Sequence, residues 1–245
     1  MTTENATESP AAQPAGSSGG HPAGDIVALD ARAVRASVQV VSRVRAADLA
    51  RPTPCGEWTL GELLAHMTAQ HDGFAAAAAG SGADLARWQP AKPAADPAVE
   101  YAAAARRVLT AFGAVGVLDR QFALPEISQK VRFPAAQAIG FHLVDYVVHG
   151  WDVSRSLGLD GASYRLEPDR LEPDLLSADL LSADLLRAAL LRAALLIAQS
   201  VPDDERRRQP AAAFAPRVPS AADADPLSPL DRIVALLGRR PQWPA

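Results

Sequence analysis

The 245-residue sequence predicts an all-α protein, and three features of its composition lead to that fold class. Alanine is abundant, aromatic residues make up only 5% of the chain, and glycine is mostly confined to the N-terminal tail, the turns and the predicted helix ends. Such a mixture favours helices that pack through small side chains over sheets.

The bulk properties indicate a globular protein that acts away from nucleic acids and membranes. Hydrophobic residues make up 49% of the chain and charged residues 21%, which allows a sizeable core. A net charge of -4 and a pI near 5.7, with no long basic run, argue against nucleic acids and anionic membranes as partners. Cys55 is the single cysteine and no signal-peptide pattern is present, so we expect a cytoplasmic location.

The chain divides into a tail and one helical unit. Residues 1–24 are mostly Ser, Thr, Pro, Gly and Ala, which cannot offset the entropy of ordering, so we predict a disordered tail. Residues 25–245 carry the helical patterns. The first is a helix over 25–49, where apolar residues recur near a period of 3.6, and two prolines and a glycine in 51–58 end it.

The middle of the chain predicts three further helices and one extended segment. Thr59 and Glu62 form a capping box, which opens a second helix that runs to about residue 79. A Pro-containing linker precedes a third helix over 98–112, and alternating residues in 119–132 predict a short extended excursion. A fourth helix begins with Pro134 in its first turn and ends at Gly158. A fifth helix is expected over 172–199.

The C-terminal part contains a flexible connection over 210–226 and a short helix over 230–237, which Ser228 caps and Gly238 ends. Residues 165–194 consist of three pentads that each occur twice, RLEPD, LLSAD and LLRAA. Five residues advance a helix by about 140°, so the leucines of this segment spread around the helix and leave no polar face. We interpret the doublets as a duplication artefact or an engineered change that carries no chemistry.

The most informative segment is 141–158, with the sequence FHLVDYVVHGWDVSRSLG. On a helix, four of its polar side chains share an arc of about 80°: His142, Asp145, His149 and Asp152. Such a stripe of polar side chains either faces water or binds a positively charged group. Asp145 and His149 are spaced to grip one cation, although spacing alone favours a surface ion pair between them.

A metal would need a third ligand from a facing helix, and the second helix offers His66 and His71. Periodicity slightly favours His71, because it falls inside the apolar stripe of that helix and His66 lies at its edge. Asp152 is placed either to accept a hydrogen bond from a ligand imidazole or to pair with Arg155. His142 either lines a pocket or lies at the helix flank.

Other residues have simpler interpretations. Trp151 points away from the polar arc and is expected in interhelical packing. Cys55 precedes a helix N-terminus, where thiolates are favoured, but a lone cysteine in a Pro-Cys-Gly turn is more often a small packing residue. The sequence has no Gly-rich phosphate loop and no serine nucleophile elbow, which argues against nucleotide chemistry and serine hydrolase triads.

Three motifs resemble those of the DinB-like family. They are TPCGEWTLGELLAH at 53–66, DYVVHGWDVSRSLG at 145–158 and PLDRIVALLGRRPQW at 229–243. The motifs occur in the family's order, and the resemblance as a whole covers about residues 25–243. They are most similar to the actinobacterial branch related to the mycothiol-dependent maleylpyruvate isomerase metal-binding domain.

The resemblance implies a four-helix bundle with additional C-terminal helices and one divalent metal held by His66, Asp145 and His149. Zinc is the expected metal, with nickel or iron as alternatives, because two imidazoles and one carboxylate discriminate poorly between them. The isomerase relatives usually have glutamate at the carboxylate position, so Asp145 has a shorter reach. Asp152 and His142 would lie beside the ligands.

The resemblance also implies a metal-dependent thiol transferase or isomerase that uses mycothiol and acts on a small-molecule thiol or electrophile. One rival hypothesis is a non-catalytic, metal-stabilised module for binding or homodimer formation. Another is a carrier of apolar ligands in which the polar stripe is incidental.

Overall fold

The computed structural model describes residues 22–56, 58–90, 96–159, 178–208, 214–219 and 227–244. These residues form six α-helices, four short 3-10 helices and one two-stranded sheet, so the all-α prediction is confirmed. The predicted tail lies outside the described residues up to residue 21. Helix α1 already begins at Pro22, three residues before the predicted start.

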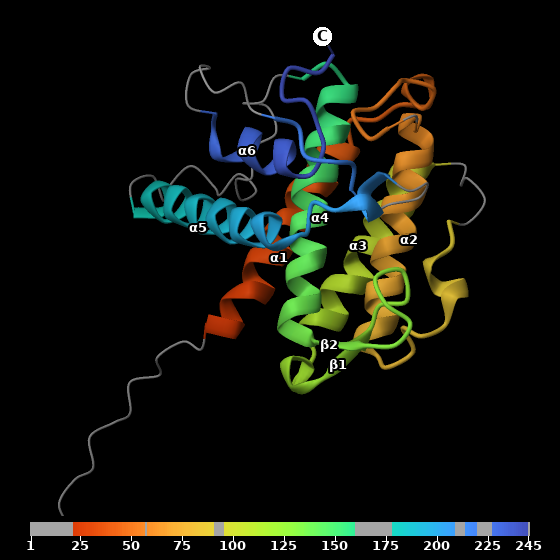
Figure 1. Ribbon diagram of the computed structural model, residues 1–245, viewed down its shortest axis with the longest axis vertical. Helices are drawn as coiled ribbons and strands as arrows, with labels where there is room; N and C mark the ends of the chain where they lie inside the picture. Colours follow the sequence, from red (N-terminus) through yellow and green to blue (C-terminus); the bar gives the residue numbers. More distant parts are fainter. Residues whose placement is uncertain are drawn as a thin grey trace, which may run out of the picture.

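Four helices form the bundle that the resemblance implies (Figure 1). They are α1 (Pro22–Val41), α2 (Leu60–Ala78), α3 (Pro97–Phe112) and α4 (Ala135–Ser156). Helices α1 and α2 each pack against both α3 and α4. The buried positions follow the helical period. In α1 they are Asp30, Ala33, Val34, Ala36, Ser37, Val40 and Val41.

Helices α2, α3, α4 and α6 begin and end within about two residues of the predicted bounds. The Thr59 side chain accepts the Glu62 backbone N–H at 3.3 Å, and the Glu62 carboxylate accepts the Thr59 backbone N–H at 2.8 Å, so the predicted capping box is present. Pro134 directly precedes α4 instead of lying within its first turn. Helix α1 ends at Val41, well before the predicted residue 49, because a valine-rich end propagates a helix poorly.

A β-hairpin closes one end of the bundle. Strands β1 (Gln121–Ala123) and β2 (Arg132–Pro134) pair antiparallel with Phe122 opposite Phe133, which confirms the predicted extended excursion. Phe122 is buried in a hydrophobic cluster with residues of α2, α3 and α4. The loop over 51–59 and the C-terminal end lie at the other end of the bundle (Figure 1).

Two further helices lie beside the bundle. Helix α5 (Ala178–Ser200) contacts α1, α4 and α6 (Pro229–Leu236). The Ser228 hydroxyl accepts the Asp231 backbone N–H at 3.1 Å, which confirms the predicted cap. Gly238 follows α6 with φ of 85°, a conformation that favours glycine after a helix.

The doubled pentads leave leucines on more than one face of α5. Leu190 is buried against the bundle, whereas Leu185 and Leu196 expose 70% and 61% of their surface. Residues 160–177 and most of the predicted connection over 210–226 lie outside the described residues. Among the described helices, none is both long and apolar enough to cross a bilayer.

Candidate metal centre

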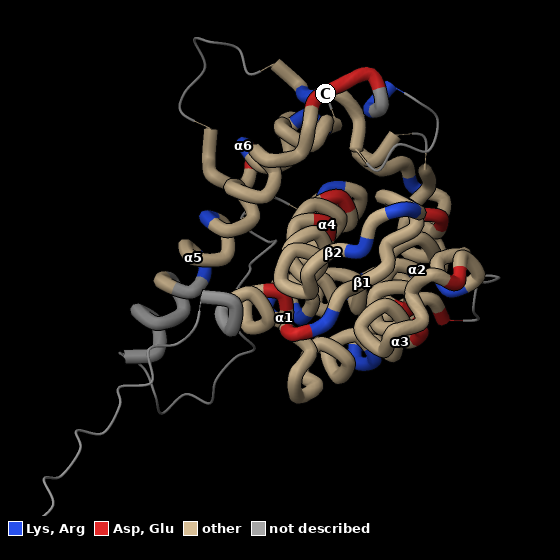
Figure 2. Tube along the Cα trace, turned by 60° about the horizontal axis from the view of Figure 1, so that its bottom comes forward, with Lys and Arg blue, Asp and Glu red and all other residues tan. Residues whose placement is uncertain are grey.

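Helix α4 carries its polar stripe inside the protein. His142, His149 and Asp152 expose at most 2% of their surface, and the Asp145 side chain exposes 17%. Figure 2 shows the other charged residues distributed over most of the described elements. Helix α4, which carries acidic residues, is surrounded by the other helices in the same view. The stripe therefore does not face water, and a surface ion pair does not explain it.

Three of the predicted ligands converge at one point. One ring nitrogen each of His66 and His149 and one carboxylate oxygen of Asp145 lie within 4.8 Å of one another. Asp145 Oδ1 and His149 Nε2 are 3.3 Å apart, and the two imidazole rings meet edge to face. A tetrahedral ion with bonds of about 2.0–2.1 Å separates its ligand atoms by about 3.3 Å. The distance between Asp145 Oδ1 and His149 Nε2 matches that spacing.

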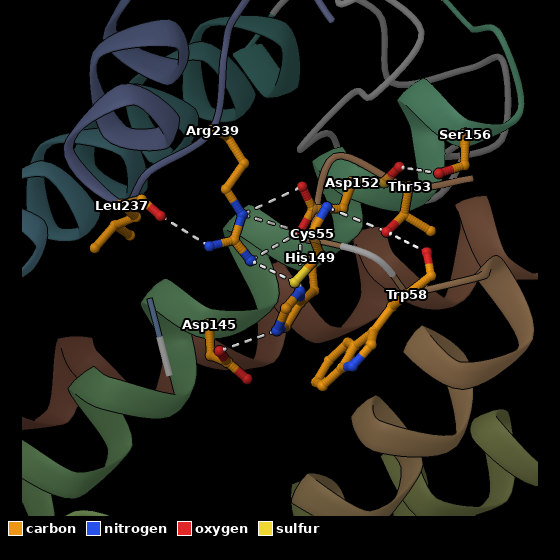
Figure 3. Close-up of polar contacts among 9 residues, drawn as sticks. All are labelled: Thr53, Cys55, Trp58, Asp145, His149, Asp152, Ser156, Leu237 and Arg239. Carbon is orange, nitrogen blue, oxygen red and sulfur yellow. Dashed lines mark hydrogen bonds and ion pairs between the residues drawn. The ribbon is translucent and has the colours of Figure 1, made fainter. Parts of the chain in front are cut away.

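A second carboxylate orients the His149 ring. His149 Nδ1 lies 3.0 Å from Asp152 Oδ2, so the other ring nitrogen, Nε2, points toward Asp145 (Figure 3). Asp152 is also paired with Arg239, whose Nη2 lies 3.2 Å from Oδ2. The sequence left open an ion pair between Asp152 and Arg155. In the structure the Arg155 guanidinium instead donates to the backbone carbonyl of Trp243.

The electrostatics of the cluster favour a positive charge between the carboxylates. Burial alone would raise the pKa of Asp145, but the charge and hydrogen bond of His149, with smaller contributions from His66 and His142, together outweigh it and lower this pKa to about 2. Burial opposes protonation of His149, yet Asp145 and Asp152 raise its pKa to about 10. Burial and the charge on His149 lower the pKa of His66 to about 4. The carboxylates thus favour a positive charge at this point, and either a proton on His149 or a bound metal ion can supply it.

The loop before α2 forms one wall of the site. Thr53 Oγ1 donates to the Trp58 carbonyl at 2.9 Å and accepts the Cys55 N–H at 3.1 Å, which closes the loop on itself. The ring centroids of Trp58 and His66 lie 4.7 Å apart, and Trp58 is 38% exposed. Burial raises the pKa of the Cys55 thiol, and this fits the predicted packing role of Cys55.

A further carboxyl group, that of Glu126, belongs to the hairpin and interacts electrostatically with Asp145. Gln70 lies one turn after His66 on α2, and its Nε2 donates to Glu126 Oε2 at 2.7 Å. Partial burial raises the pKa of Glu126, Gln70 opposes the shift and the nearby Asp145 reinforces it. A separate surface hollow of about 500 Å³ lies between α2 and α3, but none of its lining residues belongs to the ligand cluster.

The other two histidines of the inner helices form a different cluster. His142 Nδ1 lies 2.7 Å from Asp30 Oδ1, and His142 Nε2 lies 3.1 Å from His71 Nδ1. The His71 ring stacks on Tyr146 at 3.9 Å. Periodicity slightly favours His71 as a ligand, but the structure places His66, and not His71, beside Asp145 and His149. Helix α2 is buried on more than one face, so its apolar stripe does not identify the face that points toward Asp145.

Sequence reasoning missed four groups that shape the site or its surroundings, namely Trp58, Arg239, Asp30 and Glu126. Trp58 and Arg239 stand inside the quoted motifs, so the motifs held the signal without showing which residues contact the centre. Asp30 lies in the first helix with no motif around it. Only the packing of α1 against α4 brings it to His142.

Comparison with known proteins agrees with this architecture. Residues 31–154 match the family model of the mycothiol maleylpyruvate isomerase N-terminal domain. Two curated relatives, the uncharacterized proteins Rv0738 and MT0763 of Mycobacterium tuberculosis strains H37Rv and CDC 1551, are each 30% identical over 132 residues. The alignment covers 52% of this chain and 64% of each relative, so the chain spans less than two thirds of their length. No solved structure matches the chain.

Proposed function

Because the chain belongs to the mycothiol maleylpyruvate isomerase N-terminal domain family, whose DinB-like members bind metals, we propose that it uses a divalent metal in thiol-dependent transfer or isomerisation. His66, Asp145 and His149 would hold the metal. The observation that carries the proposal is the convergence of their three donor atoms within 4.8 Å. Zinc suits this ligand set best, with nickel or iron as alternatives.

The proposed chemistry divides between the metal and the surrounding side chains. When bound, a divalent metal supplies the positive charge that lowers the pKa of a coordinated thiol and favours the nucleophilic thiolate. His66, Asp145 and His149 would supply three ligands, which would leave room for such a thiol to bind the metal. The exposed Trp58 ring offers an apolar wall for the organic part of a substrate, and Glu126 can hold or release a proton beside the site.

The proposed partners are a mycothiol-type thiol and a small electrophile. Both would bind on the side of the cluster that Trp58 borders, because Trp58 is exposed whereas His149 and Asp152 are buried. A cytoplasmic location, where such thiols stay reduced, is part of the same proposal.

Metal analysis tests the first half of the proposal. Protein purified without a histidine tag should contain about one divalent ion per chain, and His66→Ala should lose it because two donors remain. His71→Gln is the matched control, since it changes a histidine on the same helix outside the cluster, and it should keep the metal. Equally little metal in the wild type and in His66→Ala would contradict the proposal.

Turnover tests the second half. The metal-loaded protein should consume electrophiles from a panel only when a thiol is present, and His66→Ala should abolish that consumption. Full metal occupancy without turnover would support the alternative, a non-catalytic metal-stabilised module for binding or homodimer formation. Size-exclusion chromatography of the loaded and metal-free protein would then show whether the metal controls dimer formation.

A further inference from the structure

One arginine from the C-terminal segment reaches the back of the ligand cluster. Arg239 follows α6, lies outside the matched residues 31–154 and is only 3% exposed. Its Nη2 lies 3.2 Å from Asp152 Oδ2 and 3.0 Å from Cys55 Sγ, while Nη1 donates to the Leu237 carbonyl at 2.8 Å (Figure 3). The guanidinium thus has three partners, and one of them, Asp152, is the carboxylate that contacts His149.

The position of Asp152 explains why this contact matters. Asp152 is fully buried, and a buried carboxylate is costly without a compensating charge and hydrogen bonds. Arg239 supplies both. The oxygen that Arg239 Nη2 contacts, Asp152 Oδ2, also lies 3.0 Å from His149 Nδ1, and this contact orients the ring so that Nε2 joins His66 and Asp145.

We propose that Arg239 is a positioning residue of the metal centre, which acts through Asp152 on His149. This inference rests on the proposed function, because it assigns a role at the same site. It also makes the C-terminal segment part of the centre, although the ligands themselves come from α2 and α4. Loss of Arg239 should leave the three ligands in place and weaken their hold on a metal ion.

A second arginine provides the control. Arg155 on α4 donates to the Trp243 carbonyl, so it also ties the C-terminal segment to the bundle. Within the described part of the chain, its guanidinium makes no hydrogen bond or ion pair with Asp152. Arg155→Gln therefore loosens the same segment while it leaves the contact between Arg239 and Asp152 intact.

Affinity for Co²⁺ in competition with a chelator tests the proposal in the full-length chain. Arg239→Gln should weaken Co²⁺ binding about 10- to 100-fold and alter the visible Co²⁺ spectrum. Arg239→Lys should recover part of this loss because it keeps the charge. The double variant Arg239→Gln/Asp152→Asn should bind no more weakly than Asp152→Asn alone, within about twofold, because both changes break one chain of contacts.

The outcomes separate the two proposals. If Arg239→Gln keeps its Co²⁺ affinity, or Arg155→Gln weakens binding as much, the role of Arg239 is overturned while the metal centre stands. If the wild type binds no Co²⁺ or Zn²⁺, the proposed function fails and this inference fails with it. If Arg239→Gln does not fold, Arg239→Lys and Asp152→Asn decide. Equal affinities for these two and the wild type would overturn the role.

Discussion

Helix α4 carries two polar clusters that use the same residue types in different geometries. At the ligand cluster, donor atoms of His66, Asp145 and His149 converge on one point. At the interior cluster, Asp30, His142 and His71 form a line in which each residue bonds only the next, at 2.7 and 3.1 Å. All three interior residues are fully buried, whereas His66 and Asp145 are only partly buried.

The difference shows that geometry decides what such residues can do. A metal ion needs several donors at one place and a path to solvent or substrate. A line of hydrogen-bonded groups instead orders protons and fixes neighbouring helices, here α1, α4 and α2. Its two ends, Asp30 Oδ2 and His71 Nε2, are buried without a hydrogen-bond partner among the described residues, so nothing there completes a ligand set.

Removing the middle of the interior line should give the largest change in stability. His142→Ala leaves Asp30 and His71 without their partner, and breaking a buried pair of this kind costs about 3–5 kcal/mol. Urea denaturation of the metal-free protein measures this loss. Metal affinity of the folded fraction should stay within about twofold of the wild type. If His142→Ala loses metal as His66→Ala does, the two clusters do not have separate roles.

The interior cluster should also make the protein acid-sensitive. Burial, with smaller contributions from His142 and Arg107, holds the pKa of His71 well below its ordinary value of 6.5. A folded-state pKa below the unfolded value gives stability that is present above pH 6.5 and is lost as the pH falls below it. The loss should approach about 1.4 kcal/mol per pH unit for this one group.

His71→Gln isolates that contribution, because glutamine keeps a polar partner for His142 and takes up no proton. Denaturation curves between pH 6.5 and 5 should have a shallower pH dependence in His71→Gln than in the wild type. Equal slopes in the two proteins would show that His71 takes up its proton equally in the folded and unfolded states, and the expected acid sensitivity would then not come from the interior line.

The smallest expected effect concerns the element that both clusters share. Helix α2 carries His66 and His71, and Thr59 caps its first turn. Thr59→Ala should cost about 1 kcal/mol of unfolding free energy, as the loss of an N-cap usually does. Metal affinity should change no more than about twofold, since the cap holds the helix and not one cluster. A selective loss of metal would mean that the first turn positions His66 directly.

Local features of the structure followed from local sequence. The capping box at Thr59, the cap at Ser228 and the glycine after α4 depend on residues within one or two turns, so their chemistry is readable without a fold. The helical period likewise placed Asp145 and His149 on one face. The doubled pentads also behaved as their five-residue step requires, with leucines left exposed on α5.

The sequence by itself determined that the protein is helical, where most helices begin, and that α4 presents a pair of side chains spaced to grip a cation. Only the tertiary structure decided that His66 meets this pair while His71 joins Asp30 and His142, because both faces of α2 are buried and periodicity cannot tell them apart. It also decided that Asp152 pairs with Arg239, 87 residues away, since a contact across that distance depends on how α4 and the C-terminal segment pack.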